Sequence, residues 1–166
     1  MAAILSAPRR DMQMRICRAN SAARVALARE LFEAYSAWLG IDLSFQGFAE
    51  ELATLPGLYE PPNGRLLIAL AGCEAAGCVA LRPLDDGLCE MKRLFVRAPF
   101  RGQGLGQRLI ERIVAEARAI GYRAMRLDTL PSMQDAIRRY EALGFVRCAS
   151  YYETPMPHTV FMELQL

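Results

Sequence analysis

The sequence predicts a layered α/β domain, in which a mixed, mostly antiparallel seven-stranded sheet is flanked by about four helices. Three observations support this fold class. Three apolar runs joined by short turns are typical of an antiparallel meander. Segments whose apolar residues recur with a helical period precede and follow that meander in the sequence, and glycines mark their ends. Further strand-like runs alternate with helices up to the last residue.

The first third of the chain predicts one strand and two helices. Side chains alternate over Met12–Ala19 as in a half-buried strand, and Asn20–Ser21 offers a helix cap. Apolar residues then follow a helical stripe over Ala22–Leu39, which ends at Gly40. A second helix is expected over 44–55, before a connection rich in proline and glycine.

The central third predicts the three strands of the meander. They are expected at 66–72, 78–84 and 88–96, because each is a short apolar run bounded by turn residues. The turns between them are expected at 74–77 and 85–87, where glycine and acidic residues gather.

The last third predicts two helices and three strands in alternation. A strong helical period spans 104–120, and a strand is expected over 122–130. A shorter helix over 134–143 precedes two final strands at 145–152 and 158–166.

Length and composition favour one folded domain. A chain of 166 residues suits one ordinary domain and is too short for two, so we expect a single domain over 12–166 after a flexible N-terminal leader over 1–11. No apolar run approaches the roughly 20 residues that span a bilayer. The opening MAAILSAPRRDM lacks the order of charges of a secretory signal, which predicts a cytoplasmic protein.

Charge and cysteine content narrow the function classes. The 20 basic and 18 acidic residues form no long block of one sign, so we expect neither nucleic acid nor a membrane as partner. Five cysteines at irregular spacings do not suggest a disulfide framework, and no histidine completes a zinc site. We therefore expect no metal.

The segment RGQGLG, from Arg101 to Gly106, is the most informative motif of the chain. Its three glycines lie where an apolar strand gives way to a long helix. Glycine lets the main chain approach a ligand closely, and the N–H groups of a first helical turn attract anions. Arg101 adds a positive charge. The same glycines also suit a plain tight turn, so the context has to decide.

The context disfavours two familiar nucleotide motifs. A dinucleotide-binding turn follows the first strand of a parallel unit, whereas this one follows antiparallel hairpins. The lysine and hydroxyl residue that end a Walker loop are also missing after GQGLGQR.

Three motifs together resemble the GNAT superfamily of N-acetyltransferases. Arg101, Gly104 and Gly106 match the phosphate-loop motif of that family, KRLFVRAPF is similar to its fourth strand, and AIRRYEALGF is similar to its next signature helix. The resemblance implies a GNAT-like acyl-CoA acyltransferase fold that moves an acetyl group from acetyl-CoA directly to a primary amine of a small molecule, peptide or protein. A non-catalytic acyl-CoA-binding sensor or interaction module is the alternative.

The resemblance also implies how acetyl-CoA is held, in a cleft between the fourth and fifth strands. The main chain of Leu94, Phe95 and Val96 would bind the pantetheine arm as an added strand would. The pyrophosphate would contact the turn that follows Arg101, namely Gly102, Gln103, Gly104, Leu105, Gly106 and Gln107.

Two residues match catalytic positions of relatives. Tyr140 corresponds to a tyrosine that protonates the coenzyme A sulfur, although a packed core tyrosine is the alternative. Glu90 corresponds to a glutamate base, and two-residue alternation would place it on the same face as Leu94 and Val96. The alternatives for Glu90 are a salt bridge with Lys92 or Arg93 or a solvated strand position, and a water-mediated proton path could replace the glutamate base.

One position departs from the family pattern, and the acceptor is not specified. Met133 stands where many members carry an asparagine that contacts the cofactor, and Ser132 or Gln134 is a candidate substitute.

The segments that line the acceptor pocket in this family hold a set of aromatic and polar residues here. Core packing or a homodimer contact is the alternative role of this set. Its members are Trp38, Phe45, Tyr59, Tyr151, Tyr152, Glu153 and His158.

Overall fold

The computed structural model describes residues 13–166, so the leader predicted over 1–11 lies outside the described residues. One seven-stranded sheet runs in the order β1-β2-β3-β4-β5-β7-β6, and only the β4–β5 pair is parallel. The predicted fold class is confirmed. The strands are β1 (Met14–Arg18), β2 (Arg65–Ala71), β3 (Glu74–Pro83), β4 (Leu88–Val96), β5 (Ala124–Thr129), β6 (Val146–Arg147) and β7 (Val160–Gln165).

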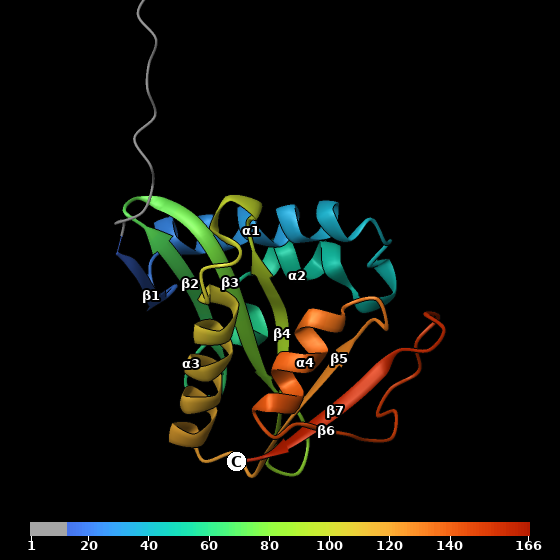
Figure 1. Cartoon of the computed structure of the whole chain (residues 1–166). Coiled ribbons are helices and arrows are strands. Elements are labelled where there is room, and N and C mark those ends of the chain that lie inside the picture. The colour runs from blue at the N-terminus through green and yellow to red at the C-terminus, as the bar shows by residue number, and fades with distance from the viewer. Residues whose placement is uncertain (1–12) are drawn as a thin grey trace, which may run out of the picture.

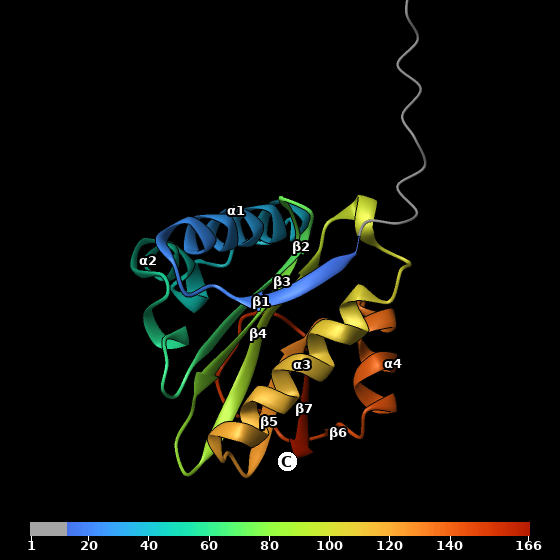
Figure 2. The same cartoon turned by 90° about the vertical axis from the view of Figure 1, so that its left-hand side faces the viewer.

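Helices cover both faces of the sheet, as Figures 1 and 2 show. They are α1 (Ala22–Leu39), α2 (Phe48–Thr54), α3 (Leu105–Ile120) and α4 (Gln134–Ala142). One apolar core packs α1 and α2 on one face, and a larger core packs α3 and α4 on the other. No helix within residues 13–166 is long and apolar enough to cross a membrane.

Capping residues set the ends of the long helices. The Ser21 hydroxyl accepts a hydrogen bond from the Arg24 N–H at the start of α1. Gly40 ends α1 and Gly121 ends α3, both in the left-handed conformation, with φ of 67° and 101°. These helix ends agree with the prediction from sequence.

Two predicted elements have different bounds in the structure. The helix expected over 44–55 is divided into a 3-10 turn, Ser44–Gln46, and α2, because Gly47 between them has a φ of 69°. The turn expected at 74–77 lies earlier, at 72–73, and residue 74 already pairs with residue 71. The second strand of the meander is therefore longer than predicted.

The strand predicted over 145–152 is wrong beyond Arg147. Only Val146–Arg147 pairs with β7, and the following residues form an irregular loop. The Tyr151 hydroxyl donates to the buried carboxylate of Glu90 at 2.8 Å, and the Tyr152 hydroxyl donates to the partly buried carboxylate of Asp128 at 2.9 Å. Neighbouring residues of a strand point to opposite faces, so a strand would not allow both contacts.

The β4 and β5 strands separate after a short ladder. Only Leu88–Glu90 of β4 pairs with β5, through Ala124–Arg126. Beyond that ladder the two strands diverge (Figure 1). The remaining part of β4, from Met91 to Val96, therefore has main-chain polar groups that β5 does not pair.

A bulge changes the direction of side chains within β4. The register with β3 shifts between Cys78 and Ala80, and Arg93 opposite them has a φ of 58°. Cys89 and Met91 pack in the core beneath α3 and α4, so Glu90 and Lys92, which alternate with them before the bulge, point to the opposite face of the sheet. The side chains on the two sides of the bulge therefore do not follow a single alternation.

Candidate functional site

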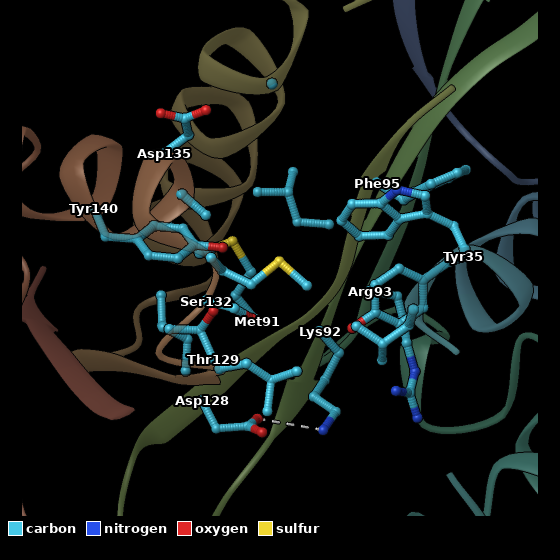
Figure 3. Close-up of a pocket in the computed structure, with 18 of the residues that line it drawn as sticks. Tyr35, Met91, Lys92, Arg93, Phe95, Asp128, Thr129, Ser132, Asp135 and Tyr140 are labelled. Carbon is cyan, nitrogen blue, oxygen red and sulfur yellow. Dashed lines mark ion pairs between the residues drawn. The ribbon is translucent and has the colours of Figure 1, made fainter. Parts of the chain in front are cut away.

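A cavity of about 520 Å³ lies where β4 and β5 separate. Residues from both faces of the sheet line it. The glycine turn and Tyr140 belong to the side of α3 and α4, whereas Tyr35 and Gln46 belong to the side of α1 and α2. Figure 3 shows Tyr140 and Phe95 on opposite sides of this space, with Lys92 and Asp128 at its floor.

The glycine turn presents the start of α3 to the cavity. Gly102 and Gly104 have φ values of 73° and 75°, and a Cβ at either position would meet nothing within 4 Å. Gly104 is the N-cap and provides no side-chain cap, and the first turn of α3 holds no acidic residue. The N–H groups of this turn are therefore available to an anion.

The residues predicted to contact pyrophosphate are distributed unequally around the cavity. The side chains of Gln103 and Gln107 bond to Pro99 and Glu111, at 3.3 and 3.0 Å, and neither residue lines the cavity. Those that line it are Arg101, Gly102, Gly104, Leu105 and Gly106.

The three predicted pantetheine-binding residues, Leu94, Phe95 and Val96, all line the cavity. The Arg101 side chain lies across the end of this strand. Its Nε donates to the Val96 carbonyl at 2.8 Å, and its guanidinium lies 4.8 Å from the centre of the Trp38 ring. The positive charge of Arg101 is thus held beside the glycine turn.

Tyr140 is buried, with 6% of its surface exposed, and its side chain points into the cavity (Figure 3). Its ring packs against Phe145, 5.6 Å away. Burial raises the pKa of Tyr140, so the hydroxyl keeps its proton at neutral pH. Within residues 13–166 that hydroxyl makes no hydrogen bond, so the proton is free to be donated.

Glu90 is fully buried but does not line the cavity. Its carboxylate accepts hydrogen bonds from Arg82 Nε at 2.6 Å and from the Tyr151 hydroxyl at 2.8 Å. Lys92 Nζ is 3.9 Å away. The closest ion pair of Glu90 is thus with Arg82, which the sequence did not suggest.

The expected shared face of Glu90, Leu94 and Val96 is wrong. Leu94 and Val96 pack against the core beneath α3 and α4, whereas Glu90 binds Arg82 and Tyr151 outside that core. The bulge at Arg93 inserts one extra residue between them.

Sequence reasoning suggested no functional role for the two charged residues at the cavity floor, Lys92 and Asp128. Lys92 Nζ lies 3.6 Å from an Asp128 oxygen, and Tyr152 donates to the other oxygen at 2.9 Å. Burial lowers the pKa of Lys92. A signal existed, because Lys92 is the only lysine of the chain and lies in a strand that is otherwise mostly apolar.

The remaining candidates divide between the cavity and other regions. Met133 is the N-cap residue of α4 and lines the cavity, together with Ser132 and Gln134. Those of the acceptor set that line it are Trp38, Phe45 and Tyr152, and those that do not are Tyr59, Tyr151, Glu153 and His158. Residues 13–166 contain no group of histidine, cysteine and acidic side chains placed to hold a metal.

The sequence matches known acetyltransferases over most of its length. Residues 26–145 match the acetyltransferase (GNAT) family. An uncharacterized N-acetyltransferase of Schizosaccharomyces pombe is 41% identical over 138 residues, which cover 82% of this chain and 85% of that protein. Another, from Dictyostelium discoideum, is 32% identical over 205 residues, covering 86% and 95% of the two chains.

Solved structures share the fold. An acetyltransferase from Streptococcus agalactiae has a TM-score of 0.76 at 24% identity, covering 92% of this chain and 98% of that one. An acetyltransferase from Salmonella typhimurium, solved with its cofactor acetyl-CoA, has a TM-score of 0.65 at 22% identity, covering 92% and 93%. Fold and sequence together define an acyltransferase enzyme. The chain belongs to the acetyltransferase (GNAT) family.

Proposed function

We propose that this enzyme transfers an acetyl group from acetyl-CoA directly to a primary amine. The observation that carries the proposal is the cavity itself, which joins the uncapped start of α3 on one side of the sheet to the carboxylate of Asp128 on the other. An anionic donor and a cationic amine can therefore meet in one space. The acetyl-CoA found in the Salmonella typhimurium relative supports the identity of the donor.

The donor is bound mainly by main-chain groups in this proposal. The pantetheine amides pair with the part of β4 that β5 leaves free, at Leu94, Phe95 and Val96. The pyrophosphate lies against the N–H groups of 102–107, where the dipole of α3 favours negative charge. Arg101 lies beside both groups and adds a positive charge to them.

The reaction needs a proton donor for sulfur, and Tyr140 is suited to that role. The neutral amine attacks the thioester carbonyl, so a C–N bond forms and the C–S bond breaks. The Tyr140 hydroxyl gives its proton to the departing thiolate. The amine proton passes to a base, which then releases it to solvent. The tyrosine takes a proton back from solvent before the next cycle.

The base is assigned to the Asp128 side of the cavity. Asp128 lines the cavity and can take the amine proton directly or through a water molecule, whereas Glu90 does not line the cavity. Glu90 contacts Tyr151 at 2.8 Å and lies 3.9 Å from Lys92, which is itself 3.6 Å from Asp128. Among residues 13–166 no chain of hydrogen bonds links Glu90 to the cavity, so the base in this proposal is Asp128 rather than the predicted Glu90.

Release of free thiol from acetyl-CoA tests the proposed function. We expect thiol to appear only when a primary amine is added, in an amount equal to the acetylated amine found by mass spectrometry. Tight binding of coenzyme A without amine-dependent thiol, across a broad panel of amines, would instead favour a non-catalytic acyl-CoA sensor.

A further inference from the structure

We propose that the acceptor is a free amino acid, with its amine at Asp128 and its carboxylate at Lys92. This inference rests on the proposed function and names the substrate class of the same cavity. Both side chains line the cavity and lie at its floor in Figure 3, where a dashed line joins them. They come from adjacent strands, β4 and β5, beyond the point where those strands stop pairing.

Lys92 is a buried cation with unused hydrogen-bonding capacity. Its side chain is 6% exposed, and an ammonium group has three N–H donors. Within residues 13–166 its one hydrogen bond is to the Gln46 side-chain oxygen, at 3.3 Å. The Asp128 and Glu90 oxygens are farther away, at 3.6 and 3.9 Å. A buried charge so loosely held is costly unless a ligand completes its contacts.

The other charges around Lys92 are already paired. Arg82 holds Glu90 at 2.6 Å. Arg93 holds Glu51 through two hydrogen bonds, at 3.0 and 2.7 Å. In the part of the chain that the structure describes, Lys92 therefore has no acidic partner closer than 3.6 Å, and an added carboxylate would not have to displace a short ion pair.

Asp128 provides the complementary half of the site. Within residues 13–166, one of its oxygens accepts a hydrogen bond from the Tyr152 hydroxyl, and the other has only Lys92 near it, at 3.6 Å. A carboxylate accepts several hydrogen bonds, so Asp128 retains capacity for an ammonium group. A loosely associated pair of opposite charges in one cavity matches a molecule that carries an amine and a carboxylate close together.

The walls near this pair favour an apolar side chain on the amino acid. Leu43 precedes the 3-10 turn Ser44–Gln46, Phe45 lies within that turn, and Met156 lies in the loop before β7. All three line the cavity. Leucine is therefore a suitable probe, and leucinamide is its matched control, because it keeps the amine and side chain but lacks the carboxylate.

Binding can be measured without any turnover. Since Lys92 is the only lysine, protein labelled with carbon-13 at the lysine ε position gives a single lysine side-chain resonance. We expect leucine to shift that resonance in a saturable manner and leucinamide to shift it less and only at higher concentration, because leucinamide keeps the amine but lacks the carboxylate. Absence of a shift at saturating leucine would overturn the inference while leaving the proposed acetyl transfer to be judged by thiol release.

Kinetics provide the second test. The amine of leucinamide resembles a chain-terminal amine, with a pKa of about 7.7–8.0, so it is more often neutral than that of leucine. Intrinsic reactivity therefore favours leucinamide. We nevertheless expect kcat/KM for leucine to exceed that for leucinamide by about tenfold or more, because a hydrogen bond to a charged group is lost with the amide. Equal or better use of leucinamide contradicts the inference.

Variants separate the two halves of the site. Lys92→Met should remove the preference for leucine, whereas Asp128→Asn should lower kcat/KM for both substrates. Arg147→Met is the matched control, since it also removes one positive charge but at an exposed position on β6, and it should keep the preference. Circular dichroism and coenzyme A binding verify folding. A preference that survives Lys92→Met, or acetylation of Lys92 itself, would overturn the inference.

Discussion

A single hydroxyl distinguishes Tyr140 from a core aromatic. Its ring packs against Phe145 while the hydroxyl faces the cavity. Tyr140→Phe keeps the packing, so we expect coenzyme A affinity within about twofold of the wild type but kcat lower by about 10²-fold, the usual size of general-acid catalysis. Isothermal titration with coenzyme A and steady-state thiol release measure the two effects.

The matched control for this substitution is Tyr122→Phe. Tyr122 donates its hydroxyl to the Asn63 carbonyl at 2.6 Å, and neither residue lines the cavity. It should change kcat little. If Tyr140→Phe were as active as Tyr122→Phe, the proton for the thiolate would have to come from water, and Tyr140 would be a core residue only.

The roles of Lys92 and Asp128 show why single residues are hard to assign from sequence. The other residues of each strand are mostly apolar. To place Lys92 beside Asp128, one must know that β4 and β5 are adjacent and that they separate beyond Glu90. That arrangement joins residues about 36 positions apart in the chain. The motif residues Leu94 and Gly104, in contrast, lie close in sequence, and the resemblance of their motifs to the GNAT family predicts that both belong to one site.

At the scale of the elements, the start of α3 is the part of the site most directly open to a test. Gly104 has a φ of 75°, which asparagine and aspartate tolerate better than other side chains. Gly104→Asn and Gly104→Asp add side chains of equal size into open space, and they differ by one negative charge. This pair separates charge from backbone strain.

We expect Gly104→Asp to weaken acetyl-CoA binding by about tenfold or more relative to Gly104→Asn, because the carboxylate would face the phosphates at the start of a helix. Titration at low and high salt measures the difference, which should shrink as salt screens the repulsion. Equal affinities of the two variants would mean that the pyrophosphate lies elsewhere.

Elements with strong periodicity were predicted well, and irregular ones were not. The stripe of α1 and its glycine end are encoded locally, so their bounds were found from sequence. The bulge at Arg93 depends on the register between β3 and β4, which no local pattern reveals. In the loop after Arg147, side chains alternate in sequence as in a strand. Hydrogen bonds of Tyr151 and Tyr152 to carboxylates far away in the sequence favour an irregular loop instead.

At the scale of the whole molecule, one buried carboxylate ties the edge of the sheet to α3. Glu116 is 4% exposed and binds three arginines from separate elements. Arg18 of β1 lies at 2.6 Å, Arg65 of β2 at 2.9 Å and Arg112 of α3 at 2.9 Å. The acidic partner is thus shared by the first strand, the meander and the helix that begins at the glycine turn, so its loss should affect the stability of the whole domain.

Glu116→Gln should lower the free energy of unfolding by about 1–3 kcal/mol, and therefore Tm by several degrees. Burial alone would raise the pKa of Glu116, but hydrogen bonds from the three arginines lower it to about 2. Because the folded pKa lies below the unfolded value of 4.5, this stabilisation is complete above pH 4.5 and is lost as pH falls towards 2.

Denaturant unfolding at pH 7 and pH 3 tests this pH dependence. The difference in unfolding free energy between wild type and Glu116→Gln should be smaller at pH 3 than at pH 7. Glu111→Gln, at an exposed position of the same helix, should show neither effect, and a pH-independent difference for Glu116→Gln would contradict the ionic role.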